Sequence, residues 1–473
     1  MPSKHGDANS RWERLWLPVL TGVLLLPACA LALGRTVNFD EWLVLRSAWL
    51  LSAGHDSNIP FLMPMTALIG QLASSEYLPS LLVPALRMAA FALVLSSLLF
   101  GICRQTRDTF TVCLAVLLTM ASGAFYTHAI EFRYDLVILC CWLSAWGLLA
   151  QPGSRTALWL GILSAILATH HTKGLFYAAW LAAVSLAFLP RSTTAWKSFV
   201  LGFALTTMLW VTFLLAQGHA HQAWQVYEQF ATLGATHPRV SAWQSLHPRL
   251  AADGAWWLLI LILLIIGKVR HPRWAPSPSA ALAIAPLAFI LLHPHPWDYL
   301  IAPLVPFFAL VAAQEVSHWV NFKGRQLALR WGPVTLVCIA LLGANTLMHS
   351  HASRNAADLQ VLDATQRLMR TGDRVLDPSG VLYMVQPTDT AWYRDTLWPG
   401  NAAAPDWSRA TWVVASYRLK WVDPQWERNL STHHRQVCGW LWLHKNDMRL
   451  KDMRAACTTP PKQRLANHWE RAN

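Results

Sequence analysis

Long runs of apolar residues, separated by short polar segments, fill the chain from about residue 15 to residue 348. Most runs approach the roughly 20 residues that a helix needs to cross the ~30 Å hydrocarbon core of a bilayer. The first run follows three basic residues like a signal peptide, but it continues to Leu33, so we expect an uncleaved helix. The pattern predicts about eleven membrane-spanning helices, over residues 15–34, 86–102, 110–128, 135–150, 156–169, 174–189, 198–216, 255–267, 278–292, 300–315 and 331–348.

Residues 156–190 decide how the later helices are oriented. A single helix over this stretch would be about 52 Å long, too long for one crossing. A hairpin keeps Arg155 and Arg191 on one side and makes His170–Gly174 its turn. Its first arm would span only about 21 Å, so Lys173 should lie at membrane depth. An ionisable group at that depth is expensive and indicates function.

Three polar stretches interrupt the runs. Residues 35–85 form a long segment broken by prolines, in which 41–51 and 61–72 have an apolar face and suit helices lying in the membrane interface. Residues 217–254 form a second long loop, rich in His and Trp. A short turn, His293–Tyr299, joins the ninth and tenth predicted helices.

After residue 348 the chain becomes polar. We therefore expect a membrane domain over 1–348 and a small soluble α/β domain over 349–473. The pattern predicts a helix over 355–370 and strands over 374–376, 412–417 and 436–443. No catalytic motif is visible there, which favours a structural or acceptor-guiding domain. Six of the eight cysteines lie in or beside the predicted spans, and Cys438 and Cys457 are candidates for a disulfide in an oxidising compartment.

Composition agrees with a membrane protein, since 54% of the residues are hydrophobic and only 13% are charged, half the share of a soluble domain. The net charge of +13 is unevenly placed. If the N-terminus is cytoplasmic, the short inner segments carry 14 Lys and Arg residues and the longer outer loops seven before residue 349. This positive-inside bias fixes the orientation in a cytoplasmic (inner) membrane. It places the C-terminal domain outside and excludes nucleic acid as the reason for the charge.

The acidic residues follow the opposite distribution. Orientation rules place little demand on acids, so their gathering on one side needs another cause. An outer-facing polar cavity is the simplest cause. The outer carboxylates are those of Asp40, Glu41, Asp56, Glu76, Glu131, Asp135, Glu228, Asp253 and Asp298.

The order of several short motifs carries a family resemblance. The pair Asp40-Glu41 follows the first span, Arg87 stands at the mouth of the second, and Glu131–Asp135 opens the fourth. Thr172-Lys173-Gly174 occupies the next outer turn, and a His/Pro/Tyr turn precedes a span that contains two prolines. Over residues 1–348 the chain resembles the integral-membrane glycosyltransferases of superfamily C (GT-C), in particular the branch with protein O-mannosyltransferases and the lipid A aminoarabinose transferase.

The resemblance implies an inverting transfer of a monosaccharide from a polyprenyl-phosphate donor on the outer face. Asp40, with Glu41 beside it, would be the base or the acceptor-orienting group, because the attacking hydroxyl must lose a proton. Lys173 and Arg133 would meet the phosphate as its negative charge grows. Asp135 would orient the donor or, with Asp40, hold a divalent cation. Further candidates for substrate binding are Arg87, His171, His295 and Tyr299.

Each residue also has a plain structural interpretation. Asp40 could pair with a nearby arginine, Lys173 could be an interfacial lysine whose amine extends to water, and Arg133 could pair only with Glu131 or Asp135. The histidines around the two outer turns could form hydrogen bonds at the interface.

Three other functions compete with the transferase. They are a transporter or lipid flippase, which would tend to show internal repeats, a polysaccharide polymerase or ligase acting on lipid-pyrophosphate oligosaccharides, and a non-catalytic assembly protein. The sequence leaves open the sugar and the acceptor, which could be a protein, a lipid or a glycan.

Overall fold

The computed structural model divides the chain into two compact units. The membrane unit comprises Met1–Ala32, Arg87–Leu215 and Gly234–Ser350, and the second unit comprises Leu33–Leu86, Ala216–Leu233 and His351–Asn473. The structure describes residues 22–35, 39–52, 64–72, 79–225, 227–228, 241–270, 277–293, 298–321, 338–344, 346–347, 361–362, 364–365, 367–370, 372–377, 382, 405–415, 419 and 423–456.

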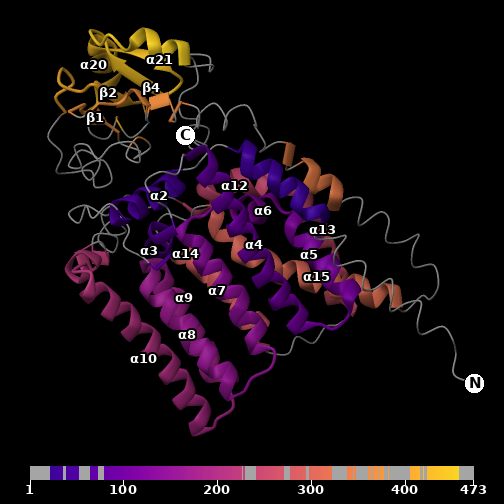
Figure 1. Cartoon of the computed structure of the whole chain (residues 1–473). Coiled ribbons are helices and arrows are strands. Elements are labelled where there is room, and N and C mark those ends of the chain that lie inside the picture. Colours follow the sequence, from indigo (N-terminus) through magenta and orange to yellow (C-terminus); the bar gives the residue numbers. More distant parts are fainter. Residues whose placement is uncertain are drawn as a thin grey trace, which may run out of the picture. The chain divides into compact units, whose positions relative to one another are not determined.

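The described part of the membrane unit is helical throughout (Figure 1). A first helix covers Gly22–Gly34. It is followed by α4 (Pro79–Gln105), α5 (Thr109–Ala121), α6 (Gly123–Ala129), α7 (Tyr134–Leu149), α8 (Ser154–His170), α9 (Thr172–Phe188), α10 (Thr193–Ala216), α12 (Ala242–Ala252), α13 (Gly254–Arg270), α14 (Pro278–Leu292), the 3-10 helix η2 (Asp298–Leu304) and α15 (Val305–Asn321).

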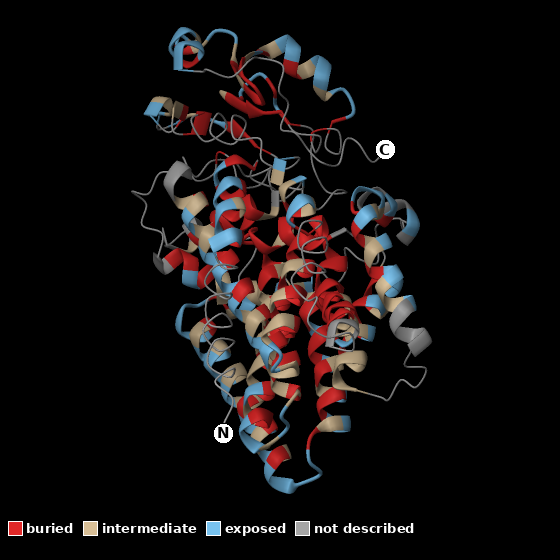
Figure 2. Cartoon of the chain, turned by 90° about the vertical axis from the view of Figure 1, so that its right-hand side faces the viewer, coloured by how far each residue is buried: buried red, intermediate tan, exposed pale blue. Residues whose placement is uncertain are grey.

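Several of these helices are long and apolar enough to cross a membrane. Three qualify singly, over Leu82–Gln105, Thr193–Ala216 and Tyr299–His318, and α5 with α6 would make a fourth span if the bent pair is one crossing. Shorter apolar helices fall on five more of the predicted spans. Buried positions lie along the sides of the helices that face one another (Figure 2), and the exposed side chains of α10 are mostly apolar, as contact with lipid requires.

The stretch 156–190 is a helical hairpin, as the length argument predicted. α8 ends at His170, α9 begins at Thr172, and the two helices pack against each other. Glycine permits close approach, because a Cβ built at Gly174 would lie 2.0 Å from the carbonyl oxygen of Leu167. Close approach also joins α8 to α10, where a Cβ at Gly161 would lie 2.0 Å from the Phe199 oxygen. Small residues at such contacts are typical of membrane helices.

The predicted span over 110–128 is not one continuous helix. The helix breaks at Ser122, and α6 leaves α5 at an angle of 87°. The buried N-terminus of α6 is capped by Asp253, whose carboxylate accepts hydrogen bonds from the backbone amides of Gly123 (3.1 Å) and Ala124 (2.7 Å) and from the Ser122 hydroxyl (3.1 Å). A partner about 130 residues away therefore stabilises the break, and an apolar run cannot reveal it.

The predicted span over 300–315 also starts differently. It opens as η2, with Pro303 inside it, and continues as α15. α6 packs against η2, and α7 packs against η2, α8 and α9. The C-terminal end of α6, the first turns of α7 and α9, and η2 thereby meet at one place.

The second unit contains α2 (Phe39–Ser52) and α3 (Pro64–Leu72), which pack against each other. They coincide with the two helices predicted in the long segment 35–85. Asp40 and Glu41 stand in the first turn of α2, where carboxylates interact favourably with the helix dipole. Glu41 is fully buried.

The C-terminal part of this unit holds a four-stranded sheet in the order β1 (Val375–Leu376), β2 (Trp412–Val414), β4 (Leu441–His444), β3 (His434–Cys438). β1 and β2 are parallel and the other pairs are antiparallel. The helices α20 (Trp426–His433) and α21 (Leu450–Ala456) complete its described part.

The single strand predicted over 436–443 is wrong, since it is the hairpin of β3 and β4. The chain reverses at Gly439, whose φ of 46° favours glycine. Cys438, at the end of β3, is disulfide-bonded, and its predicted partner Cys457 lies outside the described residues.

Candidate functional site

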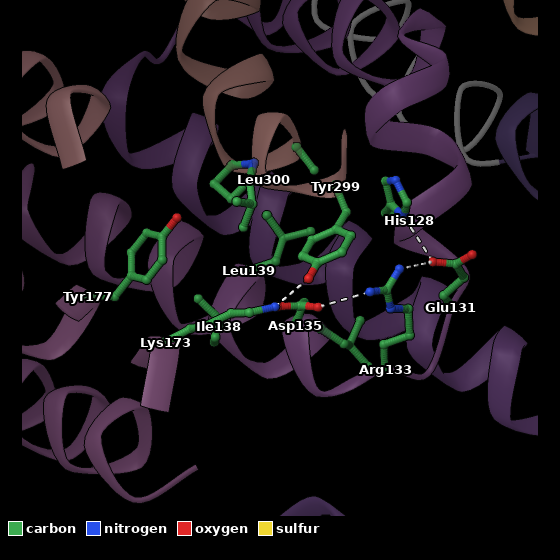
Figure 3. A pocket seen from close by; sticks show the side chains of 13 residues that line it. His128, Glu131, Arg133, Asp135, Ile138, Leu139, Lys173, Tyr177, Tyr299 and Leu300 are labelled. Atoms are coloured by element: carbon green, nitrogen blue, oxygen red, sulfur yellow. Dashed lines mark hydrogen bonds and ion pairs between the residues drawn. The ribbon is translucent and has the colours of Figure 1, made fainter. Parts of the chain in front are cut away.

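A cavity lies where α6, α7, α9 and η2 meet in the membrane unit. One side is apolar and the other carries ionisable groups that form a continuous chain of contacts (Figure 3). The lining residues are His128, Glu131, Arg133, Asp135, Leu136, Ile138, Leu139, Lys173, Tyr177, Tyr299, Leu300, Ala302 and Pro303.

Lys173 is placed by the hairpin turn. It stands in the first turn of α9, where His171 is the N-cap and its Nδ1 accepts a hydrogen bond from the backbone amide of Lys173 at 3.1 Å. Only 9% of the lysine side chain is exposed. A cation is unfavourable beside the positive end of a helix and in a buried place. Lys173 therefore needs negative or polar partners.

Those partners come from α7 and η2. The ammonium group of Lys173 donates to the hydroxyl of Tyr134 (3.2 Å), to Asp135 Oδ1 (3.4 Å) and to the hydroxyl of Tyr299. It also lies 4.4 Å from the centre of the Tyr299 ring, within the range of a cation–π contact. Tyr299 and Asp135 thus hold the lysine at the cavity.

Arg133 approaches the same tyrosine from another side. Its guanidinium lies 4.1 Å from the centre of the Tyr299 ring. It donates to Asp135 Oδ2 and to Glu131 Oε2, both at 3.3 Å. Asp135 therefore bridges Arg133 and Lys173, one on each carboxylate oxygen, and its place in the first turn of α7 is also favourable for a carboxylate.

The chain of contacts ends at His128, near the C-terminal end of α6. Its Nδ1 lies 2.8 Å from Glu131 Oε2, the oxygen that also accepts from Arg133. Its ring meets Tyr299 edge to face, with ring centres 5.9 Å apart. Sequence reasoning missed His128, and it counted Glu131 among the outer carboxylates and as a possible partner of Arg133 without naming it as a site residue. The one signal available was the spacing of a histidine three residues before an acid at the end of an apolar run.

The structure brings four of the predicted site residues together: Arg133, Asp135, Lys173 and Tyr299. His171 does not line the cavity, but it supports the site because it caps α9 and stacks on Tyr134 with ring centres 4.5 Å apart. Its neighbour His170 bonds the backbone oxygen of Tyr134 at 3.1 Å.

The other predicted site residues lie elsewhere. Arg87 is fully buried in the membrane unit and donates to the backbone oxygen of Ala32 at 3.2 Å. Asp40 and Glu41 belong to the second unit, and their catalytic roles stay predictions. His295 lies outside the described residues.

The surroundings of Asp135 do not fit a divalent cation. Both of its oxygens already accept from cationic groups, Lys173 and Arg133, which would repel a metal ion. Among the residues that the structure describes, no cluster of three or more His, Cys, Asp or Glu side chains could hold a metal.

The charges of the lining groups suit an anionic ligand. Two cations, Arg133 and Lys173, are held by two carboxylates, those of Glu131 and Asp135, and tyrosine hydroxyls add further polar atoms. Cations fixed in a low-dielectric cavity bind a phosphate far more strongly than they would in water. The apolar lining fits a hydrophobic ligand tail or a desolvated reaction centre.

Comparisons with known proteins give one kind of likeness. No family model matches the chain, and no curated protein matches its sequence. Two crystal structures of ArnT from Cupriavidus metallidurans are similar. One, bound to undecaprenyl phosphate, has a TM-score of 0.62 and 13% sequence identity over 93% of this chain and 99% of that one. The other, in the apo state, has a TM-score of 0.61 and 14% identity over 92% and 98%.

At such low identity the likeness establishes the fold. The chain shares the fold of ArnT, and the predicted fold class, an all-α membrane domain with a small C-terminal α/β domain, is confirmed.

Proposed function

We propose that this chain is a membrane glycosyltransferase that moves a monosaccharide from a polyprenyl-phosphate donor to an acceptor on the outer face of the inner membrane, with inversion. The cluster of Lys173, Tyr299, Asp135 and Arg133 carries the proposal, since it offers two buried cations beside an apolar cavity. The shared fold with a transferase structure that holds undecaprenyl phosphate adds support.

The mechanism is a single displacement. An acceptor hydroxyl attacks the anomeric carbon, and the bond from that carbon to the phosphate oxygen breaks. Asp40, with Glu41 beside it, takes the hydroxyl proton. Lys173 and Arg133 meet the phosphate as its charge rises, an interaction stronger in the transition state than in the ground state.

Asp135 and Tyr299 have supporting roles in this mechanism. Asp135 fixes both cations by its contacts of 3.3 and 3.4 Å. The Tyr299 hydroxyl bonds to Lys173 and would add a donor for a phosphate oxygen. Arg87, buried in the membrane unit, and His171, the N-cap of α9, would support the site, and substrate binding by His295 stays a prediction. The N-terminus would be cytoplasmic and the C-terminal domain outside, which the charge bias supports.

The test is mass spectrometry of envelope lipids, glycans and glycoproteins from cells with the wild type, Asp40→Asn or Lys173→Met. Loss of one sugar from one acceptor, with accumulation of its polyprenyl-phosphate form, is expected for both variants. It would identify the acceptor class and the sugar, hexose or pentose, at once. Unchanged profiles in both stably expressed variants would contradict the proposal.

A further inference from the structure

We infer that His128, held by Glu131, is a proton-carrying phosphate ligand of this site. The inference rests on the proposed function and assigns His128 a role on the leaving-group side of the reaction. The fold places His128 at the cavity, and the sequence alone did not indicate this.

The two edges of the His128 ring have different surroundings. Nδ1 is bound to Glu131 Oε2 at 2.8 Å. Nε2 is buried and has no hydrogen-bond partner among the described residues. A buried imidazole nitrogen without a partner is unfavourable, and the ring lines a cavity that suits an anion. Nε2 is therefore the edge available to a ligand, and Figure 3 shows it on the side of the ring opposite the contact with Glu131.

Glu131 prepares the ring for this role. A carboxylate at Nδ1 accepts the proton of that nitrogen, so it fixes the tautomer and the orientation of the ring and leaves Nε2 for a ligand. Arg133 shares the same Glu131 oxygen, which fixes the carboxylate in turn. Only 1% of the Glu131 side chain is exposed, so the pair is rigidly placed.

The lining charges show why a proton carrier is useful. The described ionic groups of the cavity, other than His128, comprise two cations and two carboxylates. The departing phosphate gains a negative charge, and the dianion of a phosphate monoester takes up a proton near pH 6 to become the monoanion. Imidazole is the side chain whose charge changes in the same range.

The proton transfer balances. His128 in its imidazolium form donates the Nε2 proton to the departing phosphate, which leaves as a monoanion. The acceptor's proton goes to Asp40, and both groups return to their starting states by exchange with solvent.

The groups facing His128 are few in the described part of the chain. Glu131 and Arg133 follow on the same segment, and Tyr299 comes from η2. The helix α5, which packs on α6, contains no Asp, Glu, Lys, Arg or His. At the far end of α6, Asp253 is occupied as a helix cap.

The experiment measures the affinity of the full chain, in detergent, for farnesyl phosphate between pH 6 and 8, with farnesol as the uncharged control. The key variant is His128→Asn, whose amide can keep the donor at the position of Nδ1 but carries no proton. The quantity to follow is the ratio of the Kd of the variant to that of the wild type. Both proteins meet the same ligand, so the titration of the phosphate cancels in this ratio.

We expect a ratio near 1 at pH 8 that rises to about tenfold at pH 6, as a charge-assisted hydrogen bond is gained only by the wild type. His128→Gln, with its amide at the position of Nε2, should give the same trend and serves if the Asn variant is unstable. A ratio that does not change with pH, while binding still depends on Lys173, would overturn the role of His128 alone. Binding of farnesyl phosphate that is unaffected by Lys173→Met would overturn this inference and the proposed function together.

Discussion

Replacing Lys173 with methionine tests the phosphate site most directly. Methionine keeps most of the side-chain volume and removes the ammonium group that contacts Tyr134, Asp135 and Tyr299. Because the lysine is only 9% exposed, its charge is weakly screened, and a lost contact to phosphate should cost about 2–4 kcal/mol of transition-state stabilisation. That is roughly 30- to 1000-fold in transfer rate.

The fold itself should tolerate this change. Asp135 keeps its contact with Arg133 at 3.3 Å, and a buried cation at the positive end of α9 is removed. The melting temperature should therefore stay within about 1 °C of the wild type, a shift of about 1 kcal/mol for a protein of this size. A loss of transfer without a loss of stability is the signature of a ligand contact.

The assay compares Lys173→Met with Lys197→Met, which makes the same chemical change at an exposed lysine of α10. Farnesyl phosphate affinity of the purified proteins and sugar transfer in cells are both measured. We expect the Kd to rise about 30-fold or more for Lys173→Met and to stay within about twofold for Lys197→Met. Equal affinity and transfer in the two folded variants would refute the placement of the phosphate at Lys173.

Three further predictions concern the supports of the site and the C-terminal domain. Gly174→Ala places a Cβ 2.0 Å from the Leu167 oxygen, so it should shift the start of α9, lower the melting temperature and reduce transfer. Gly153→Ala is the control: it has open space around it and should change neither the melting temperature nor transfer. Asp253→Ala leaves two backbone amides of α6 without their cap and should lower the free energy of unfolding by about 1–2 kcal/mol. Hydrogen exchange in α6 should become faster, and unchanged exchange would show that the cap does not stabilise the bend. Burial lowers the pKa of His434 to about 4, so as pH falls the unfolded state takes up a proton before the folded state does. The C-terminal sheet should therefore lose up to about 3 kcal/mol of its free energy of unfolding between pH 6.5 and pH 4. His434→Gln should reduce this pH dependence, measured as hydrogen-exchange protection of β2 and β4, and an unchanged dependence would refute the role of His434.

A second acid-sensitive contribution in the C-terminal domain lies at lower pH. Burial disfavours the ionised form of Asp373, but hydrogen bonds from Arg449 and Trp412 outweigh it and lower the pKa of the carboxyl below its ordinary value. The stabilisation by Arg449, which contacts Asp373 at 2.6 Å, is therefore present above the ordinary range of an aspartate and lost only as pH falls below it. The pH ranges in which His434 and Asp373 change the stability of the domain are therefore separate.

Much of the membrane unit was predictable because the bilayer imposes a simple rule. An apolar run must form a helix to satisfy its backbone in lipid, so the positions of α7, α8, α9 and α10 follow from the sequence. The hairpin turn that carries Lys173 followed from length alone. Because an ionisable group at membrane depth is rare, the sequence also singled out Lys173, which the structure places at the cavity.

The errors have a common cause. The bend at Ser122 depends on Asp253, which lies in another part of the chain. The hairpin of β3 and β4 depends on Gly439, in a segment too short for periodicity to separate two strands. His128 shows no special pattern in the sequence, because its role comes from the direction that the bend gives to α6.

The sequence by itself determined that the chain is a helical membrane protein, where most of its helices lie, and which residue types could bind a phosphate. These depend on local composition and on the cost of placing charge in a bilayer, both of which can be read along the chain. Only the tertiary structure decided that Arg133, Asp135, Lys173 and Tyr299 share one cavity and that Glu131 and His128 extend their network. Contacts between residues 126 positions apart, such as Lys173 and Tyr299, depend on how helices pack, and packing is set by shape complementarity among many side chains at once.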